Sequence, residues 1–265
     1  MATLVSFHAH PDDESIATGG TLARASAEGH RVVLVFGTSG ERGEVADGFL
    51  DPGEALGERR ERETRASAEV LGVHRVEFLG YQDSGMVGEA TNDDPRCFWQ
   101  ADPAEAAERL ARILAEERAD VLTVYDDHGG YGHPDHIQVH RVGHRAARIA
   151  GTPRVYESTR DRDHLRALME EAAAHEPELA DEPEARGEDD FGSPAEVITT
   201  RVGVNPWLAQ KRASMAAHAS QIPEDSFFLR MPDEVFARAW GTEWYIRVVG
   251  EPANDADDWL VPGSS

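Results

Sequence analysis

Cysteine and lysine are almost absent from this chain of 265 residues, since each occurs once, as Cys97 and Lys211. A single cysteine excludes an intramolecular disulfide framework and a zinc site built from several cysteines. No apolar run approaches the roughly 20 residues that a membrane-spanning helix needs. The N-terminus also lacks the basic and apolar regions of a signal peptide. We therefore expect a soluble, cytoplasmic protein.

Positive charge is also scarce. The chain has 26 Lys+Arg against 50 Asp+Glu, which gives a formal net charge of −24 at pH 7. A protein with this negative charge repels the phosphates of nucleic acids and anionic lipids, so we expect neither nucleic-acid nor membrane partners. The hydrophobic content of 40% is typical of a globular protein and argues against wholesale disorder. The length suits one domain with a covering subregion.

The first 150 residues alternate short apolar runs with longer amphipathic segments. Strands are predicted at 4–7, 31–36, 75–79 and 120–125, and helices at 15–28, 56–71, 103–117 and 134–149. This alternation predicts an α/β fold with a Rossmann-like, mostly parallel sheet in the order 3-2-1-4-5 and helices on both faces.

The pattern weakens beyond residue 150. We predict a metal-binding core at 1–150 and a C-terminal closing region of the same domain at 151–265. Acidic residues crowd the stretch near 170–190, which we expect to be a mobile, solvated segment. A strand is predicted at 197–204 and a helix at 206–218.

Two short stretches, residues 8–14 and 129–136, each contain the triplet His-Pro-Asp. They follow the first and fourth strands, which are neighbours in the predicted order, so their loops meet at the ligand crevice of the sheet. Alone, either motif also suits a turn or a helix cap. Together they suit a catalytic metal, which needs three nitrogen or oxygen ligands and an open position for water. The candidate ligands are His10, Asp13, His133 and His136, and the spacing leaves open which three coordinate.

The two motifs together resemble the zinc-dependent N-acetylglucosaminide deacetylases of the PIG-L (LmbE-like) type. HAHPDDES at 8–15 and GGYGHPDHI at 129–137 carry the resemblance. Smaller similarities occur at 40–44, 71–73, 83–86 and 217–222. The sequence is most similar to the branch that contains the mycothiol-biosynthesis deacetylase and the mycothiol S-conjugate amidase.

This resemblance implies a single bound metal ion. The family's ligands match His10, Asp13 and His136, with water or substrate in the remaining position. Zinc is the expected cofactor, and ferrous iron suits the same mixed ligands.

The resemblance also implies catalytic roles for four residues. Asp12 matches the general base, and His133 matches the residue that protonates the leaving amine. Asp135 is expected to orient His133, and the Tyr131 hydroxyl to help stabilise the oxyanion.

Three further residues are candidate substrate contacts. Arg60 matches a family position that binds the sugar or its aglycone, although a charge-paired exposed helix would also explain it. Asp83 would accept sugar hydroxyls or form an Asx turn. Of Gln221 and His218, one is expected to line the pocket and the other to pack.

The expected function is hydrolysis of a linear amide. A metal-dependent deacetylase would remove an acyl group, most simply acetyl, from an N-acetylglucosamine-type sugar. Cleavage of the cysteinyl amide of a thiol conjugate, or deacetylation of a natural product, fits the same residues. A non-catalytic sugar-binding module is the alternative from another class. The partner is thus a small N-acylated amino sugar or glycoconjugate, and the sequence leaves the oligomeric state open.

Overall fold

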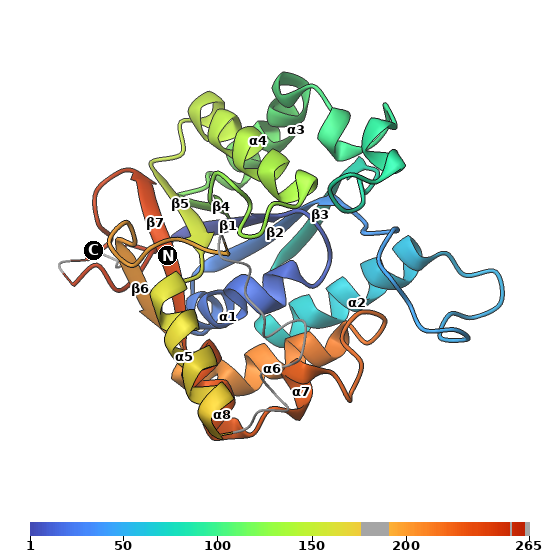
Figure 1. Cartoon of the computed structure of the whole chain (residues 1–265). Coiled ribbons are helices and arrows are strands. Elements are labelled where there is room, and N and C mark those ends of the chain that lie inside the picture. The colour runs from blue at the N-terminus through green and yellow to red at the C-terminus, as the bar shows by residue number, and fades with distance from the viewer. Residues whose placement is uncertain (176–190, 255, 263–265) are drawn as a thin grey trace.

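The computed structural model describes residues 1–175, 191–254 and 256–262, and a seven-stranded sheet forms its centre (Figure 1). The strands are β1 (Thr3–His8), β2 (Arg31–Thr38), β3 (Arg75–Tyr81), β4 (Val121–Tyr125), β5 (Arg154–Thr159), β6 (Thr200–Gly203) and β7 (Thr242–Val249). Their order is β3-β2-β1-β4-β5-β7-β6. The predicted order 3-2-1-4-5 is confirmed for the five parallel strands. Two antiparallel strands, β7 and β6, extend the sheet beyond β5.

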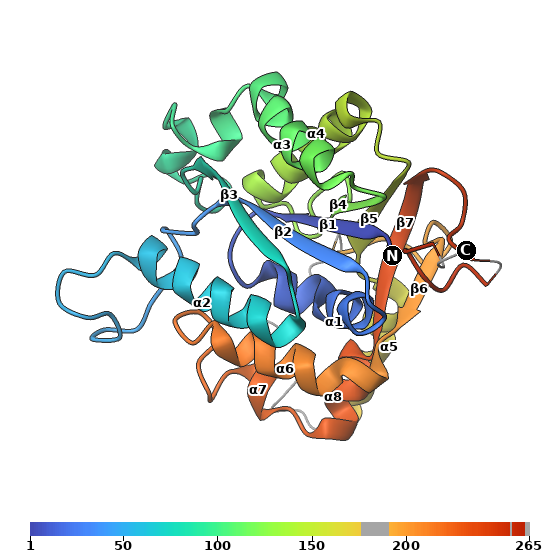
Figure 2. The same cartoon turned by 180° about the vertical axis from the view of Figure 1, so that it is seen from behind.

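Helices cover both faces of this sheet (Figures 1 and 2). They are α1 (Gly19–Ala27), α2 (Leu56–Leu71), α3 (Pro103–Glu117), α4 (Pro134–Ala150), α5 (Arg162–His175), α6 (Leu208–Ala217), α7 (Phe227–Arg230) and α8 (Asp233–Trp240). The predicted helix at 15–28 is divided, because a π-helical turn at Glu14–Thr18 precedes α1. The predicted helix at 206–218 begins with a 3-10 turn, Asn205–Trp207, and the predicted strand at 197–204 is shortened to β6.

The core lies in two layers, one on each side of the sheet. Phe7 of β1 packs in one layer with Leu110 of α3 and Val139 of α4. Leu4, three residues before Phe7, packs in the opposite layer with Leu22 of α1. Successive side chains of a strand point to opposite faces, and all six residues of β1 are buried. Burial on both faces explains why apolar residues are continuous at 32–36 in β2 and do not alternate with polar ones.

Close packing between α4 and β4 fixes the position of the helix that carries the second motif. A Cβ atom at Gly143 would lie 2.3 Å from the Cγ1 of Val124, so the side chain of any other residue would push α4 away from the sheet. The start of α4 therefore sits at the carboxyl end of β4.

The C-terminal part of the chain contains a buried ion pair whose carboxylate also binds α1. Lys211 of α6 contacts Glu243 of β7, and both side chains are almost fully buried. The Glu243 carboxylate accepts the backbone N–H groups of Gly20 and Thr21, each at 2.8 Å. These groups have no partners within the helix, because the first turn of a helix leaves its N–H groups free.

The boundary at residue 150 stays a prediction, although β5, β6 and β7 all belong to the central sheet. Most of the acidic stretch near 170–190 lies outside the described residues. Within the described ranges, no helix combines the length and the apolar character needed to cross a bilayer.

Candidate active site

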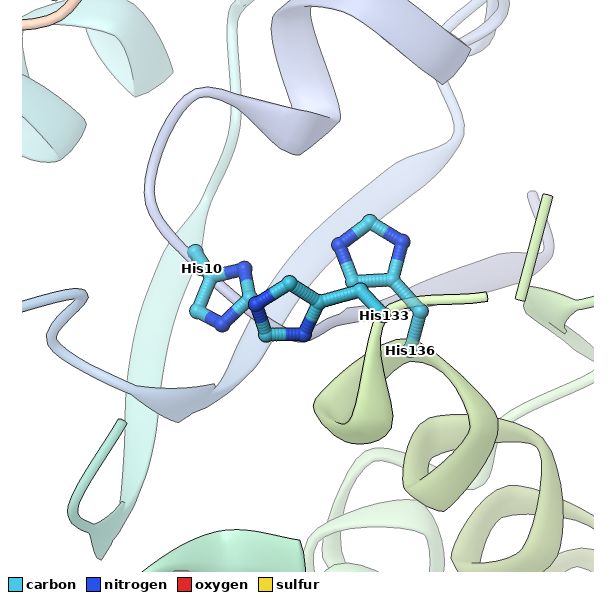
Figure 3. Close-up of side chains that lie close together, drawn as sticks. All are labelled: His10, His133 and His136. Carbon is cyan, nitrogen blue, oxygen red and sulfur yellow. The ribbon is translucent and has the colours of Figure 1, made fainter. Parts of the chain in front are cut away.

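The loop after β1 and the start of α4 meet at the carboxyl edge of the sheet, because β1 and β4 are paired neighbours. Figure 3 shows the rings of His10, His133 and His136 beside one another. The ring centroids lie 4.6 Å apart for His10 and His133 and 5.3 Å apart for His10 and His136. One ligand nitrogen from each of the three lies within 4.8 Å of the others. The two motifs therefore form one buried cluster.

Asp13 contacts two of these rings. Its Oδ2 lies 3.6 Å from the Nδ1 of His10 and 3.4 Å from the Nε2 of His136. The Nδ1 of His136 donates to the carbonyl oxygen of Gly129 at 3.2 Å, which leaves the Nε2 directed at Asp13. That Nε2 is buried and has no hydrogen-bond partner among the described residues. A metal ion between this nitrogen and the carboxylate oxygen would bind both.

The spacing fits a tetrahedral metal ion. Ligands at about 2.0–2.1 Å from zinc are separated from one another by roughly 3.3–3.4 Å, close to both Asp13 distances. Burial by itself would raise the pKa of Asp13, but His136 and His10 hold that pKa well below its usual value. The carboxylate is thus ionised and available as a ligand.

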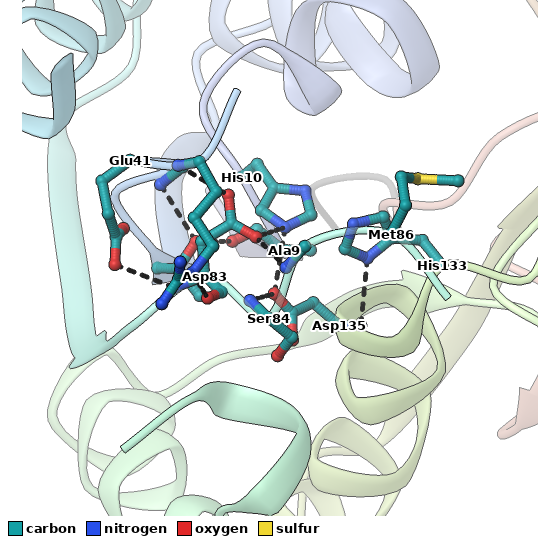
Figure 4. Close-up of polar contacts among 12 residues, drawn as sticks. Ala9, His10, Glu41, Asp83, Ser84, Met86, His133 and Asp135 are labelled. Atoms are coloured by element: carbon teal, nitrogen blue, oxygen red, sulfur yellow. Dashed lines mark hydrogen bonds and ion pairs between the residues drawn. The ribbon is translucent and has the colours of Figure 1, made fainter. Parts of the chain in front are cut away.

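The carboxylate of Asp135 orients His10. The Nε2 of His10 lies 3.1 Å from the Asp135 Oδ2, which leaves the Nδ1 of His10 facing Asp13. Asp135 is fully buried and also accepts the backbone N–H of Ser84 at 2.9 Å and the Ser84 hydroxyl (Figure 4). A carboxylate behind a histidine is the usual support for a metal ligand. Asp135 meets His133 through its backbone N–H rather than through its carboxylate, and its role in orienting His133 stays a prediction.

His133 caps the N-terminus of α4 instead. Its Nδ1 accepts the backbone N–H of Asp135 at 3.1 Å, so the neutral ring carries its proton on Nε2. Burial, together with His10 and His136, lowers the pKa of His133 to about 3. The ring is therefore neutral at physiological pH and presents an N–H rather than a lone pair at Nε2.

Asp12 has an unusual backbone conformation, with φ at +92°. Its Oδ2 lies 3.3 Å from the Nη2 of Arg60, and its backbone N–H donates to the Oε2 of Glu14 at 3.0 Å. Burial raises the pKa of Asp12 to about 6, against the opposing charge of Arg60. A carboxylate with a raised pKa, placed beside the candidate metal ligands, is suited to accept a proton.

Arg60 joins two loops of the site. Its Nη1 donates to the Gly40 carbonyl and its Nη2 to the Pro11 carbonyl, each at 2.5 Å. The side chain is buried, unlike that of an exposed charge-paired helix. Its contact with a sugar stays a prediction.

Glu14 and His218 form a buried pair to which the sequence analysis gave no catalytic role. The Oε1 of Glu14 lies 2.6 Å from the Nε2 of His218 and accepts the Ser67 hydroxyl at 2.6 Å. Burial alone would raise the pKa of Glu14 and lower that of His218, but their mutual attraction reverses both directions. Both groups are therefore charged, and Glu14 also holds the backbone of Asp12. The sequence signal that could have indicated a role for Glu14 was its position directly after Asp12 and Asp13.

Three other predicted residues lie around the cluster. Asp83 forms the Asx turn, since its Oδ1 accepts the Gly85 N–H at 2.8 Å, and the same oxygen lies 3.6 Å from the His10 Nε2. Tyr131 is 40% exposed, with its ring edge-on to His136 at 4.9 Å. Gln221 donates to the Glu44 carbonyl at 3.0 Å. Their contacts with a substrate stay predictions.

Comparison with known proteins agrees with this geometry. A family model described as PIG-L, GlcNAc-PI de-N-acetylase, matches residues 5–147, which include both motifs. The chain belongs to the PIG-L family. The resemblance seen in the two motifs is thereby confirmed.

Relatives in this family align over nearly the whole chain. A protein of Thermobifida fusca is 39% identical over 97% of this chain and 96% of its own length. A protein of Nocardiopsis dassonvillei is 41% identical over 92% of this chain and 93% of its own length. Both are named 1D-myo-inositol 2-acetamido-2-deoxy-alpha-D-glucopyranoside deacetylase.

Solved structures share the fold. The N,N'-diacetylchitobiose deacetylase of Pyrococcus horikoshii has a TM-score of 0.59 at 22% identity. The match covers 94% of this chain and 84% of that one. At this identity the likeness shows the architecture alone, and the chemistry has to be argued from the site.

Proposed function

We propose that this PIG-L family protein is a metal-dependent N-deacetylase that releases acetate from an N-acetylglucosamine-type sugar. The observation that carries the proposal is the buried, unpartnered Nε2 of His136, which faces the ionised Asp13 with the separate carboxylate of Asp12 nearby. The names of the relatives support 1D-myo-inositol 2-acetamido-2-deoxy-alpha-D-glucopyranoside as the substrate, ahead of a thiol conjugate or another natural product.

His10, Asp13 and His136 would hold the ion. His133 is unsuited to the fourth position in its present tautomer, because its Nδ1 is engaged and its Nε2 carries the proton. Two imidazoles and a carboxylate suit zinc, and the same donors would accept ferrous iron. When bound, the ion polarises the acyl carbonyl and lowers the pKa of water.

Asp12 takes the proton from the attacking water. As the water oxygen bonds to the amide carbon, one proton passes to the Asp12 carboxylate, which Glu14 and Arg60 hold in place. The C–N bond then breaks and the nitrogen takes up that proton. The products are the amine and acetic acid, which releases the second proton of the water as it ionises to acetate. Because Asp12 has a pKa of about 6, it can both accept the proton and return it near neutral pH.

His133 and Tyr131 assist the departure of the amine. The Nε2–H of His133 donates a hydrogen bond to the amide nitrogen as its lone pair develops. The Tyr131 hydroxyl supports the oxygen on which negative charge accumulates. A neutral His133 differs from the imidazolium expected from the resemblance, and the proton for the amine then comes from water through Asp12. Arg60, Asp83 and Gln221 are the proposed contacts with the sugar.

The test is Asp12→Asn, with Asp13→Asn as the matched variant at the adjacent position. Asp12→Asn should retain about one bound ion at this site and lose acetate release by roughly 10²–10⁴-fold. Asp13→Asn should lose the ion as well. Acetate and amine release from acetylated sugars and from cysteinyl amides would identify the substrate class. Full turnover by Asp12→Asn would refute the proposed base.

A further inference from the structure

A second group of potential metal ligands lies farther along α4. His140 and His144 are one helical turn apart on this helix, and Glu157 comes from the adjacent strand β5. One ligand atom from each of the three lies within 4.8 Å of the other two. We propose that His140, His144 and Glu157 form a second binding site for a divalent transition-metal ion such as Zn²⁺.

The side chains converge on one carboxylate oxygen. The Oε1 of Glu157 lies 2.8 Å from the Nε2 of His144 and 3.3 Å from the Nδ1 of His140. The two imidazole rings are 4.4 Å apart between centroids. Two histidines four residues apart on a helix point to the same side, which is a common arrangement of zinc ligands. Together with a carboxylate they supply the donor set that zinc binds with a fourth, open position.

The surroundings also suit an exchangeable cation. The side chains of His140, His144 and Glu157 are 22%, 19% and 11% exposed, so an ion and its water can reach them. The Nδ1 of His140 lies 3.1 Å from the carbonyl oxygen of Tyr125, which can only accept, so the backbone of β4 fixes the ring with its proton on Nδ1. The Nε2 of His140 is then the nitrogen that would bind the ion, and a carbonyl that accepts from the other ring nitrogen is a common support of metal-binding histidines. The net charge of −24 raises the local concentration of cations.

This site is separate from the candidate active site, although both include residues of α4 and contact Tyr125. His140 and His144 follow His136 by four and eight residues on α4, which corresponds to roughly 6–12 Å along the helix axis. Tyr125 contacts both places, since its carbonyl faces His140 and its ring stacks on His136 at 4.6 Å. The second site does not depend on the proposed deacetylase function.

The metal-free alternative is that Glu157 only accepts hydrogen bonds from the two rings. Metal content separates the two possibilities. The full chain would be stripped with a chelator, dialysed against Zn²⁺ and measured by mass spectrometry. We expect about two ions per wild-type chain and about one in His144→Gln and in Glu157→Gln. His164→Gln should keep two, because His164 contacts Trp244 and the Arg238 carbonyl outside both clusters.

Cobalt provides a second readout. The visible absorption that appears with the second equivalent of Co²⁺ in the wild type should be missing from His144→Gln, whose acetate release should be unchanged. Circular dichroism would verify folding, and Glu157→Gln serves if His144→Gln fails to fold.

Two results would overturn the second site: a wild-type chain that saturates at one ion, or a His144→Gln variant that still binds two. The Asp13→Asn variant shows which of the two sites holds the ion if the wild type binds only one. If the wild type binds one ion and Asp13→Asn none, the second site is wrong. If His144→Gln binds none instead, the error lies in the first site.

Discussion

Replacing Glu14 with glutamine tests how the catalytic loop is held in place. The Glu14 carboxylate accepts the Asp12 N–H with one oxygen and contacts His218 with the other. Glutamine has nearly the same shape, but its amide has one acceptor oxygen and carries no charge. As long as His218 keeps its proton, one of these two contacts must therefore place two donors against each other, or break.

The conformational cost of the Asp12 backbone and the free energy of its hydrogen bond to Glu14 decide what happens to Asp12. A backbone held in a sparsely populated region, such as φ of +92°, costs about 1–3 kcal/mol. A hydrogen bond to a charged acceptor contributes about 1.5–3 kcal/mol. Since these values are comparable, losing the Glu14 bond lets the loop relax and moves the carboxylate. We expect kcat to fall roughly 100-fold, because a displacement of about 1 Å has that effect on a positioned catalytic group.

The free energy of unfolding should fall as well, by about 2–4 kcal/mol, since breaking a fully buried ion pair costs up to about 5 kcal/mol. Glu243→Gln is the matched control, because Glu243 also combines a buried cation with backbone N–H donors but does not contact Asp12. Urea unfolding and acetate-release kinetics would be measured on both variants. Glu14→Gln should lose stability and kcat, and Glu243→Gln stability alone. A folded Glu14→Gln with wild-type kcat would refute the reasoning.

Three other substitutions have distinct readouts. Asp135→Asn should weaken zinc binding by about 10–100-fold, measured by competition with a chelator, because His10 loses its charged support; unchanged affinity would contradict this. The hydrogen bond from Arg31 lowers the pKa of Glu117 from 4.5 to about 2, so this pair stabilises the fold above pH 4.5 and the contribution disappears as pH falls toward 2. Thermal melts should show wild type losing more stability than Glu117→Gln over that interval, and parallel losses would count against the pair. Gly143→Ala should reduce the free energy of unfolding by about 1–3 kcal/mol in urea titrations because its methyl group meets β4, and a neutral effect would show that α4 can shift.

Four of the five parallel strands were located from the sequence because burial on both faces favours apolar runs, as at 32–36 in β2, and no strand was predicted at β5. The strand predicted at 197–204 is longer than β6, and no strand was predicted at β7. β6 is four residues long and alternates between buried and exposed positions, and only β7 at Thr242–Val249 makes it part of the sheet. Pairing of this kind depends on contacts distant in the sequence, so local composition does not reveal it.

The cluster of candidate ligands was also predictable, because two His-Pro-Asp stretches at neighbouring strand ends must meet. The supporting contacts were not. Asp135 supports His10, which is 125 residues away, because Ser84 on a third loop holds the carboxylate. His133 accepts the backbone N–H of Asp135, in the first turn of the helix that it caps. Such choices depend on side-chain orientation, which residue spacing leaves undetermined.

The bond between Glu243 and Gly20 spans 223 residues, and this has a consequence for synthesis on the ribosome. At about 5–20 residues per second, roughly 11–45 s pass between the emergence of the first helix and that of the carboxylate that caps it. During this interval α1 has unsatisfied amide groups and an uncovered apolar side. We therefore expect chaperones to bind the nascent chain until β7 has been synthesised.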